Sequence, residues 1–166
     1  MRQFKNHLGL SALDTKCILI ADGPSKRIPI EHPKLITLDY PVAVVNRVGY
    51  QYPGRKDYWF SLHPENFCEW ADRATNLSRC AFIGFKVSKL NLSTYRYINT
   101  NYRLITGGTS SLFAIENLIA IGYKEIDLYG VDMDIEPYLG HRKCWSALAD
   151  TDCVIKNKGG IWHWEN

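Results

Sequence analysis

The residues best suited to chemistry lie in a glycine- and hydroxyl-rich stretch, Gly107-Gly108-Thr109-Ser110-Ser111, which runs directly into a long apolar segment. Glycines let the backbone pass close to a ligand, and hydroxyl side chains are preferred where a helix begins. The first amides of such a helix have no intrahelical partners and carry the positive end of its dipole, so they attract an anion. We expect Thr109 and Ser110 to bind the phosphate or carboxylate of a ligand, or simply to cap the helix.

A pair of carboxylates follows the next apolar run of the chain. This run ends at Gly130-Val131-Asp132, and an acidic residue at the carboxyl end of a strand can bind a ribose hydroxyl. Asp132 and Asp134 also have the Asp-x-Asp spacing that holds Mg²⁺ or Mn²⁺ against a diphosphate, because hard cations prefer carboxylate oxygens. We therefore expect Gly130 and Asp132 to bind a nucleotide, with Asp132 and Asp134 as the ligands if a metal takes part.

A tight turn, Asp22-Gly23-Pro24-Ser25, follows an apolar run near the start of the chain. Its proline restricts the backbone, and its amides and the Ser25 hydroxyl are suited to a phosphate. The alternative is an ordinary connection between a strand and a helix. Asp22 either holds a ribose hydroxyl or caps the turn. We expect Asp22, Gly23, Pro24 and Ser25 to lie in the nucleotide site.

Two further polar positions follow apolar runs. Asn46 closes a β-branched run, and its amide side chain can donate to a phosphate and accept from a base amine. His63 follows the next run, with Glu65 two residues later. Both are candidates for the side of the site that a second substrate approaches, although Pro64 and Glu65 are also typical of the first turn of a helix.

Short apolar runs alternate with helical patterns along the chain, which predicts a mostly parallel sheet with helices on both faces. We predict strands at 17–21, 41–46, 57–62, 80–85, 125–129 and 153–155. We predict helices at 64–75, 110–122 and 141–149, and an excursion outside the core at 86–101. Because ligands of such sheets bind beyond the carboxyl ends of the strands, the polar residues described above are expected to meet at one edge.

Length and composition indicate one α/β Rossmann-like domain over residues 1–166, with residues 1–14 flexible. A net charge of +3 suits an anionic small molecule and is too small for a dedicated nucleic-acid binder. The chain has no apolar run long enough for a membrane span. Five cysteines without a CxxC pair indicate reduced thiols and a cytoplasmic location. The aromatic tail, 159–166, either packs on the domain or contacts a partner, which leaves a homo-oligomer open.

Several of these segments occur in an order that is similar to that of a known family. Ile20-Ala21-Asp22-Gly23-Pro24-Ser25, then Val45-Asn46-Arg47, then 109–132 resemble the bacterial sialyltransferases of glycosyltransferase family 42. Within the last block, Ile121-Gly122-Tyr123-Lys124-Glu125-Ile126-Asp127-Leu128 and Gly130-Val131-Asp132 are similar nearly residue for residue. Tyr138-Leu139-Gly140-His141 resembles the family segment whose histidine is the proposed general base. Asp22 stands where the family has Asn, and Ser111 where it has Gly.

The resemblance implies a GT-A-variant-like fold and a small sialyltransferase-like glycosyltransferase of phage or bacterial origin. His141 would be its catalytic base, whereas the acceptor-side position of His63 and Glu65 is an expectation from their own place in the sequence. A nucleotide-sugar donor would be the substrate, and we expect no tightly bound cofactor and no divalent metal.

Two alternatives remain open, because the same skeleton is similar to that of pterin diphosphokinase-like proteins and of short phage and prophage proteins. The first is a diphosphokinase-like phosphotransferase that uses ATP and a metal at Asp132 and Asp134. The second is a non-catalytic nucleotide-binding phage protein.

Overall fold

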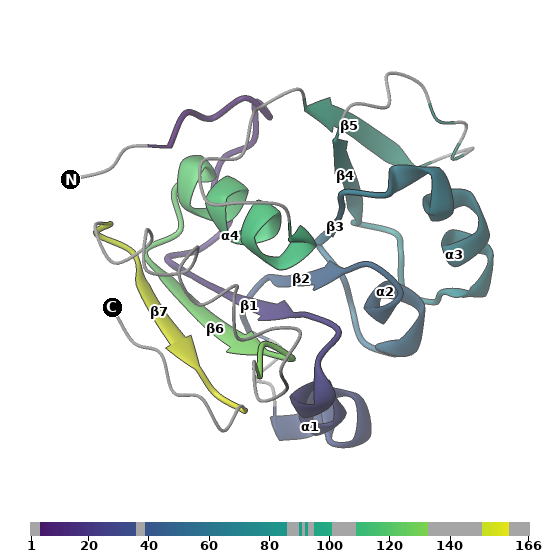
Figure 1. The fold of residues 1–166 in the computed structure, drawn as a ribbon, viewed down its shortest axis with the longest axis horizontal. Helices are drawn as coiled ribbons and strands as arrows, with labels where there is room; N and C mark the ends of the chain where they lie inside the picture. The colour runs from purple at the N-terminus through teal and green to yellow at the C-terminus, as the bar shows by residue number, and fades with distance from the viewer. Residues whose placement is uncertain are drawn as a thin grey trace.

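Within the described residues, seven parallel strands form one sheet in this computed structural model (Figure 1). The structure describes residues 4–35, 39–85, 90, 92, 95–100, 109–132 and 151–159. The strands are β1 (Lys16–Ile20), β2 (Val42–Val45), β3 (Tyr58–Ser61), β4 (Ala81–Phe85), β5 (Arg96–Thr100), β6 (Glu125–Tyr129) and β7 (Val154–Asn157). The helices are α1 (Arg27–Glu31), α2 (Val48–Gln51), α3 (Phe67–Arg73) and α4 (Ser110–Ile121), with 3-10 turns η1 (Pro24–Lys26), η2 (Pro33–Leu35) and η3 (Pro64–Asn66).

The strand order is β5-β4-β3-β2-β1-β6-β7. The chain builds the sheet outward from β1 to β5 and then returns to the other side of β1 to add β6 and β7. The direction of building therefore reverses between β1 and β6. In open α/β sheets, ligands bind beyond the carboxyl ends of the strands at such a switch point.

Helices cover both faces of the sheet, as the sequence predicts. Leu19 and Phe60 belong to the buried cluster that contains α4, whereas Ile20 and Trp59 belong to the cluster that contains residues of α2 and α3. The strand residues are buried on both faces because successive side chains of a strand point to opposite sides. Figure 1 shows α4 lying across the central part of the sheet.

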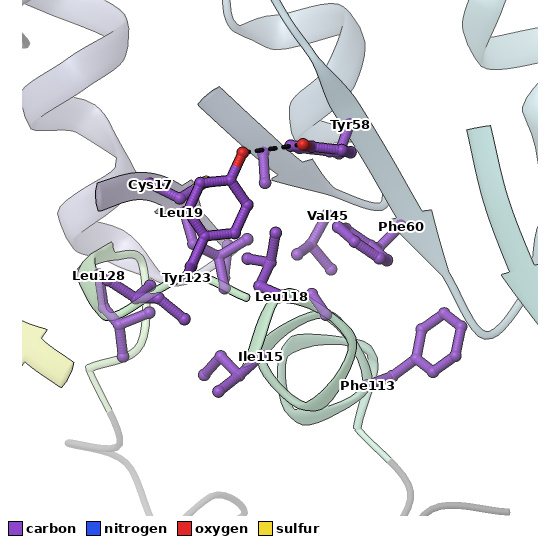
Figure 2. Close-up of a cluster of buried hydrophobic side chains, with 14 of the residues drawn as sticks. Cys17, Leu19, Val45, Tyr58, Phe60, Phe113, Ile115, Leu118, Tyr123 and Leu128 are labelled. Atoms are coloured by element: carbon purple, nitrogen blue, oxygen red, sulfur yellow. Dashed lines mark hydrogen bonds between the residues drawn. The ribbon is translucent and has the colours of Figure 1, made fainter. Parts of the chain in front are cut away.

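The core beneath α4 contains a pair of tyrosine hydroxyls (Figure 2). The hydroxyls of Tyr58 and Tyr123 lie 2.8 Å apart, and their rings meet edge to face with centroids 6.1 Å apart. Burial raises the pKa of Tyr58 to about 12. The amide of Leu13 also donates to the Tyr123 hydroxyl at 3.3 Å, and Leu8 is buried in the same cluster. The described residues of the N-terminal segment thus pack against the core.

The predicted strands correspond to β1, β2, β3, β4, β6 and β7, and the predicted helices at 64–75 and 110–122 correspond to η3 with α3 and to α4. The prediction of an excursion at 86–101 is wrong for β5, which pairs in parallel with β4. β5 is an edge strand and is mostly half-exposed, so Arg-Tyr-Ile-Asn-Thr lacks the apolar run that marks the inner strands. The predicted helix at 141–149 lies outside the described residues. None of the described helices is long and apolar enough to cross a membrane.

Candidate functional site

The loops that follow β1 and β6 meet at the switch point through two glycines. The amide of Gly23 donates to the carbonyl oxygen of Gly130 at 2.7 Å. A Cβ on Gly23 would lie 2.5 Å from that oxygen, and a Cβ on Gly130 would lie 2.0 Å from the carbonyl oxygen of Ala21. Gly130 also has a φ of +77°, a conformation that favours glycine. Contact between the two loops therefore requires glycine at both positions.

Hydrogen bonds of Ser25 and Asp132 also connect these two loops. The Ser25 amide donates to Oδ2 of Asp132 at 2.8 Å, and the Gly130 amide donates to Oγ of Ser25 at 2.7 Å. Ser25 is 8% and Asp132 5% exposed, so water has little access to these bonds. Because the Ser25 amide already has a carboxylate partner, a phosphate at this edge would need other donors.

A hollow of about 410 Å³ lies beside the hydrogen bonds of Ser25 with Asp132 and Gly130. Its lining consists of Pro24, Ser25, Arg27, Ile28, Glu31, His32, Asp132 and Gly159. Small-molecule sites usually have volumes of roughly 300–1,000 Å³. Three of the predicted site residues, Pro24, Ser25 and Asp132, therefore border space that a ligand can enter. This space lies on the β6 and β7 side of the switch point.

Asp22 holds two cations at the carboxyl edge of the sheet. Its Oδ1 pairs with Nζ of Lys26, and its Oδ2 pairs with Nε of Arg47 at 2.7 Å. The Arg47 side chain is 56% exposed, and its terminal nitrogens make no hydrogen bond or ion pair with the described residues. The sequence analysis does not single out Lys26 or Arg47 as a site residue. The four-residue spacing of Asp22 and Lys26 could have indicated their ion pair, because residues one helical turn apart can pair.

Asn46 anchors a network that links the ends of β2 and β3. Its φ is +52°, which Asn adopts more readily than most residues. Its Oδ1 accepts from the Ser61 hydroxyl at 2.8 Å, and Ser61 Oγ accepts from the His63 amide at 2.9 Å. Trp59 Nε1 donates to the Asn46 carbonyl oxygen at 2.7 Å. The side-chain NH₂ of Asn46 makes no hydrogen bond within the described part of the chain, so it can donate to a ligand.

The start of α4 joins this network. Thr109 caps the helix, since its Oγ1 accepts from the Leu112 amide at 3.2 Å. Ser110 Oγ accepts from the Leu62 amide at 3.1 Å, which ties the helix to the end of β3. The predicted residues Asn46, His63 and Ser110 therefore lie around the ends of β2 and β3, and Ser61, which the sequence does not single out, connects two of them.

His63 and Glu65 form an exposed pair at the same edge. Nδ1 of His63 lies 3.6 Å from Oε1 of Glu65, and the two side chains are 67% and 61% exposed. Both side chains are accessible from solvent, as the expected acceptor-side position requires. Gly107, Gly108, Asp134 and His141 lie outside the described residues. Among the residues that are described, no three His, Cys, Asp or Glu side chains gather as a set of metal ligands.

Comparison with known proteins supports the fold. No family model matches the chain, and no curated protein matches it. Among solved structures, the chain is similar to the X-ray structure of a point mutant of the α-2,3/8-sialyltransferase CstII, with a TM-score of 0.52 and 16% sequence identity. The match covers 85% of this chain and 80% of that one. The Rossmann-like α/β fold predicted from the sequence is confirmed, and it is shared with a glycosyltransferase.

Proposed function

We propose that the carboxyl edge of this sheet binds a nucleotide or nucleotide sugar and that the chain is a small sialyltransferase-like glycosyltransferase. The observation that carries the proposal is that Asn46, Ser61 and Ser110 lie together at the carboxyl ends of β2 and β3, next to β1, the strand at which the order reverses. Ligands of open α/β sheets bind in this place. The glycosyltransferase structure with a similar fold adds support.

The polar groups left available at this edge are mainly donors. They are the NH₂ of Asn46, the amides of Ser110 and Ser111 at the start of α4, and the terminal nitrogens of Arg47. The charge of Lys26, which pairs with Asp22, lies beside them. The carboxylate of Asp22 is paired with two cations, and that of Asp132 accepts from the Ser25 amide. An edge with free donors and occupied carboxylates favours an anionic ligand, as a nucleotide phosphate is.

In the proposed transferase, His141 would take the proton from an acceptor hydroxyl as that oxygen attacks the sugar of the donor, and the nucleotide would leave with its phosphate. Imidazole is suited to this task because it titrates near neutral pH. His63 and Glu65 would lie on the acceptor side. The resemblance to family 42 supports the role of His141.

A thermal-shift panel of CMP, CDP, UDP, ATP and their sugar conjugates tests the proposal, since a ligand that binds the native state raises the melting temperature. The most informative variant is Asn46→Asp. Aspartate keeps the acceptor for Ser61 and tolerates a positive φ, but it replaces the free NH₂ with a charged oxygen. We expect this variant to lose most of the shift.

Asn76→Asp is the matched control. Asn76 also has a positive φ, +57°, and its Nδ2 donates to the carbonyl oxygen of Pro53 at 2.6 Å on an exposed loop. This variant changes the charge by the same amount and should keep the shift. If no nucleotide in the panel stabilises the wild-type protein, or if both variants respond alike, the proposed site is wrong.

A further inference from the structure

The ion pairs around Asp22 leave a surplus of positive charge at the edge of the sheet. One carboxylate serves two cations, Lys26 from η1 and Arg47 from the loop after β2. Among the described residues, no second acidic side chain pairs with either cation. The three side chains together therefore carry a net charge of +1 next to the proposed site.

These pairs differ from an ordinary surface ion pair of the same protein. Arg27 and Glu31 pair at 3.0 Å within α1, but their side chains are 74% and 51% exposed, and the two charges cancel. The side chains of Asp22 and Lys26 are only 28% and 17% exposed. A partly buried charge interacts more strongly with a third ion than a fully exposed one, because water screens it less.

The backbone fixes where Arg47 stands. Arg47 follows Asn46, whose carbonyl oxygen accepts from Trp59 Nε1 and whose side chain accepts from Ser61. Trp59 is fully buried in the core. The ion pair with Asp22 uses Nε of Arg47, so the two terminal nitrogens remain for a bidentate contact with an oxyanion.

We propose that Arg47 and Lys26 form an oxyanion subsite that binds a phosphate or carboxylate group of the ligand. The inference rests on the proposed nucleotide site and names the side chains that recognise charge there. Asn46 and the amides of α4 would contact the same ligand from the β2 and β3 side. Affinity at this subsite would depend on salt, because at least one of the two cations is exposed.

Isothermal titration calorimetry tests the subsite with CMP, cytidine, inorganic pyrophosphate and N-acetylneuraminic acid. We expect Arg47→Gln and Lys26→Gln each to weaken CMP binding by about 10-fold or more, the scale of a lost charge-assisted hydrogen bond. Cytidine, which lacks the phosphate, should bind these variants as it binds the wild-type protein. Arg47→Lys keeps the charge and should retain part of the affinity.

Lys124→Gln is the matched control, because Lys124 precedes β6 at the amino edge of the sheet, pairs with Asp152 there, and is as exposed as Arg47. It removes one positive charge and leaves the subsite intact. The Arg47 side chain is mostly exposed, so urea unfolding should show Arg47→Gln to be folded. Loss of pyrophosphate binding in Arg47→Gln identifies the group as phosphate, and loss of N-acetylneuraminic acid binding identifies it as carboxylate. Either result supports the subsite.

The subsite is wrong if Arg47→Gln binds every anion as the wild type does, or if Lys124→Gln weakens binding equally. It is also wrong if the wild-type protein binds no anion of the panel. If pyrophosphate binds through Arg47 but no nucleotide binds, the subsite stands and the proposed nucleotide function fails.

Discussion

The amide of Ser25 and the carboxylate of Asp132 are joined by a buried 2.8 Å hydrogen bond, although 107 residues separate them along the chain. The bond connects the turn after β1 with the end of β6, the two strands that flank the switch point. In the sequence, both residues are candidates for binding a nucleotide. In the structure, the two residues also stabilise the edge of the sheet by binding each other.

Asp132→Ala is therefore expected to lower the free energy of unfolding by about 1–3 kcal/mol, because the buried Ser25 amide loses its acceptor. Asp132→Asn keeps an acceptor and should be destabilised by less than about 1 kcal/mol. Urea unfolding followed by tryptophan fluorescence measures both. Equal stability of Asp132→Ala and the wild-type protein would contradict the structural role.

Gly130→Ala should be much more destabilising than Gly9→Ala. Both glycines have positive φ values, +77° and +65°, so both substitutions strain the backbone. At Gly130 the added Cβ would also lie 2.0 Å from a backbone oxygen, whereas at Gly9 it would meet nothing within 4 Å. We expect about 1 kcal/mol for Gly9→Ala and several times that for Gly130→Ala, measured by urea unfolding. Similar losses of unfolding free energy for the two variants would show that the loops after β1 and β6 do not need their close contact.

Lys56 predicts a pH dependence of stability. It is fully buried, and its Nζ donates to the carbonyl oxygens of Gly54 at 2.9 Å and Thr75 at 2.6 Å. Burial lowers its pKa from 10.5 to about 8. Between these two values the unfolded chain holds more protons than the folded one, so the contribution of Lys56 to the free energy of unfolding rises with pH.

From pH 8 to 10.5, we expect the free energy of unfolding of the wild-type protein to rise by about 3 kcal/mol relative to that of Lys56→Met. The slope is about 1.4 kcal/mol per pH unit. The comparison cancels opposing contributions, such as that of Tyr58, whose pKa burial raises to about 12. Lys34→Met removes an exposed lysine and serves as the control. A difference that does not change with pH would contradict the burial of the charge.

Nucleotide binding should be independent of divalent metal. The expected result is that calorimetry in EDTA gives nearly the same affinity for the best nucleotide as calorimetry in Mg²⁺. A requirement for Mg²⁺ or Mn²⁺ that disappears in Asp132→Asn and Asp134→Asn would favour the diphosphokinase-like alternative, because those carboxylates would then hold the metal against the phosphates.

His141 separates a transferase from a binder. If it is a general base, donor turnover should rise with pH through the imidazole range, roughly 6 to 7. His141→Ala should lower turnover by about 100-fold or more and leave donor affinity within a few-fold. Tight nucleotide binding without detectable hydrolysis or transfer in the wild-type protein would instead support the non-catalytic alternative.

The inner strands were predictable because each is a short apolar run that is buried on both faces, as Cys17-Ile18-Leu19-Ile20 illustrates. The edge strand β5 and the short helices α1 and α2 were not. β5 is half-exposed and polar, and a helix of four or five residues is too short to show a periodic pattern.

The positions of the site residues followed from one rule, that parallel strands share a carboxyl edge, but their partners did not. The pairing of Asp22 with Arg47 joins loops from two different strands. It depends on how far apart β1 and β2 lie and on how Asn46 turns the chain, and neither is visible in the local sequence. The same holds for Ser61, which is an unremarkable strand residue until Asn46 and His63 are placed beside it.

The strand order also has a consequence for synthesis of the protein on the ribosome. β1 is an inner strand that pairs early with β2, but its other neighbour is β6, where Lys16 lies opposite Glu125. One edge of β1 therefore stays unpaired while most of the chain is being made. Such an edge can pair with a strand from another nascent chain. The risk lasts because pairing between strands far apart in the sequence forms slowly. The strand at the centre of the candidate site is thus also an inner strand that stays open to aggregation until β6 has been made.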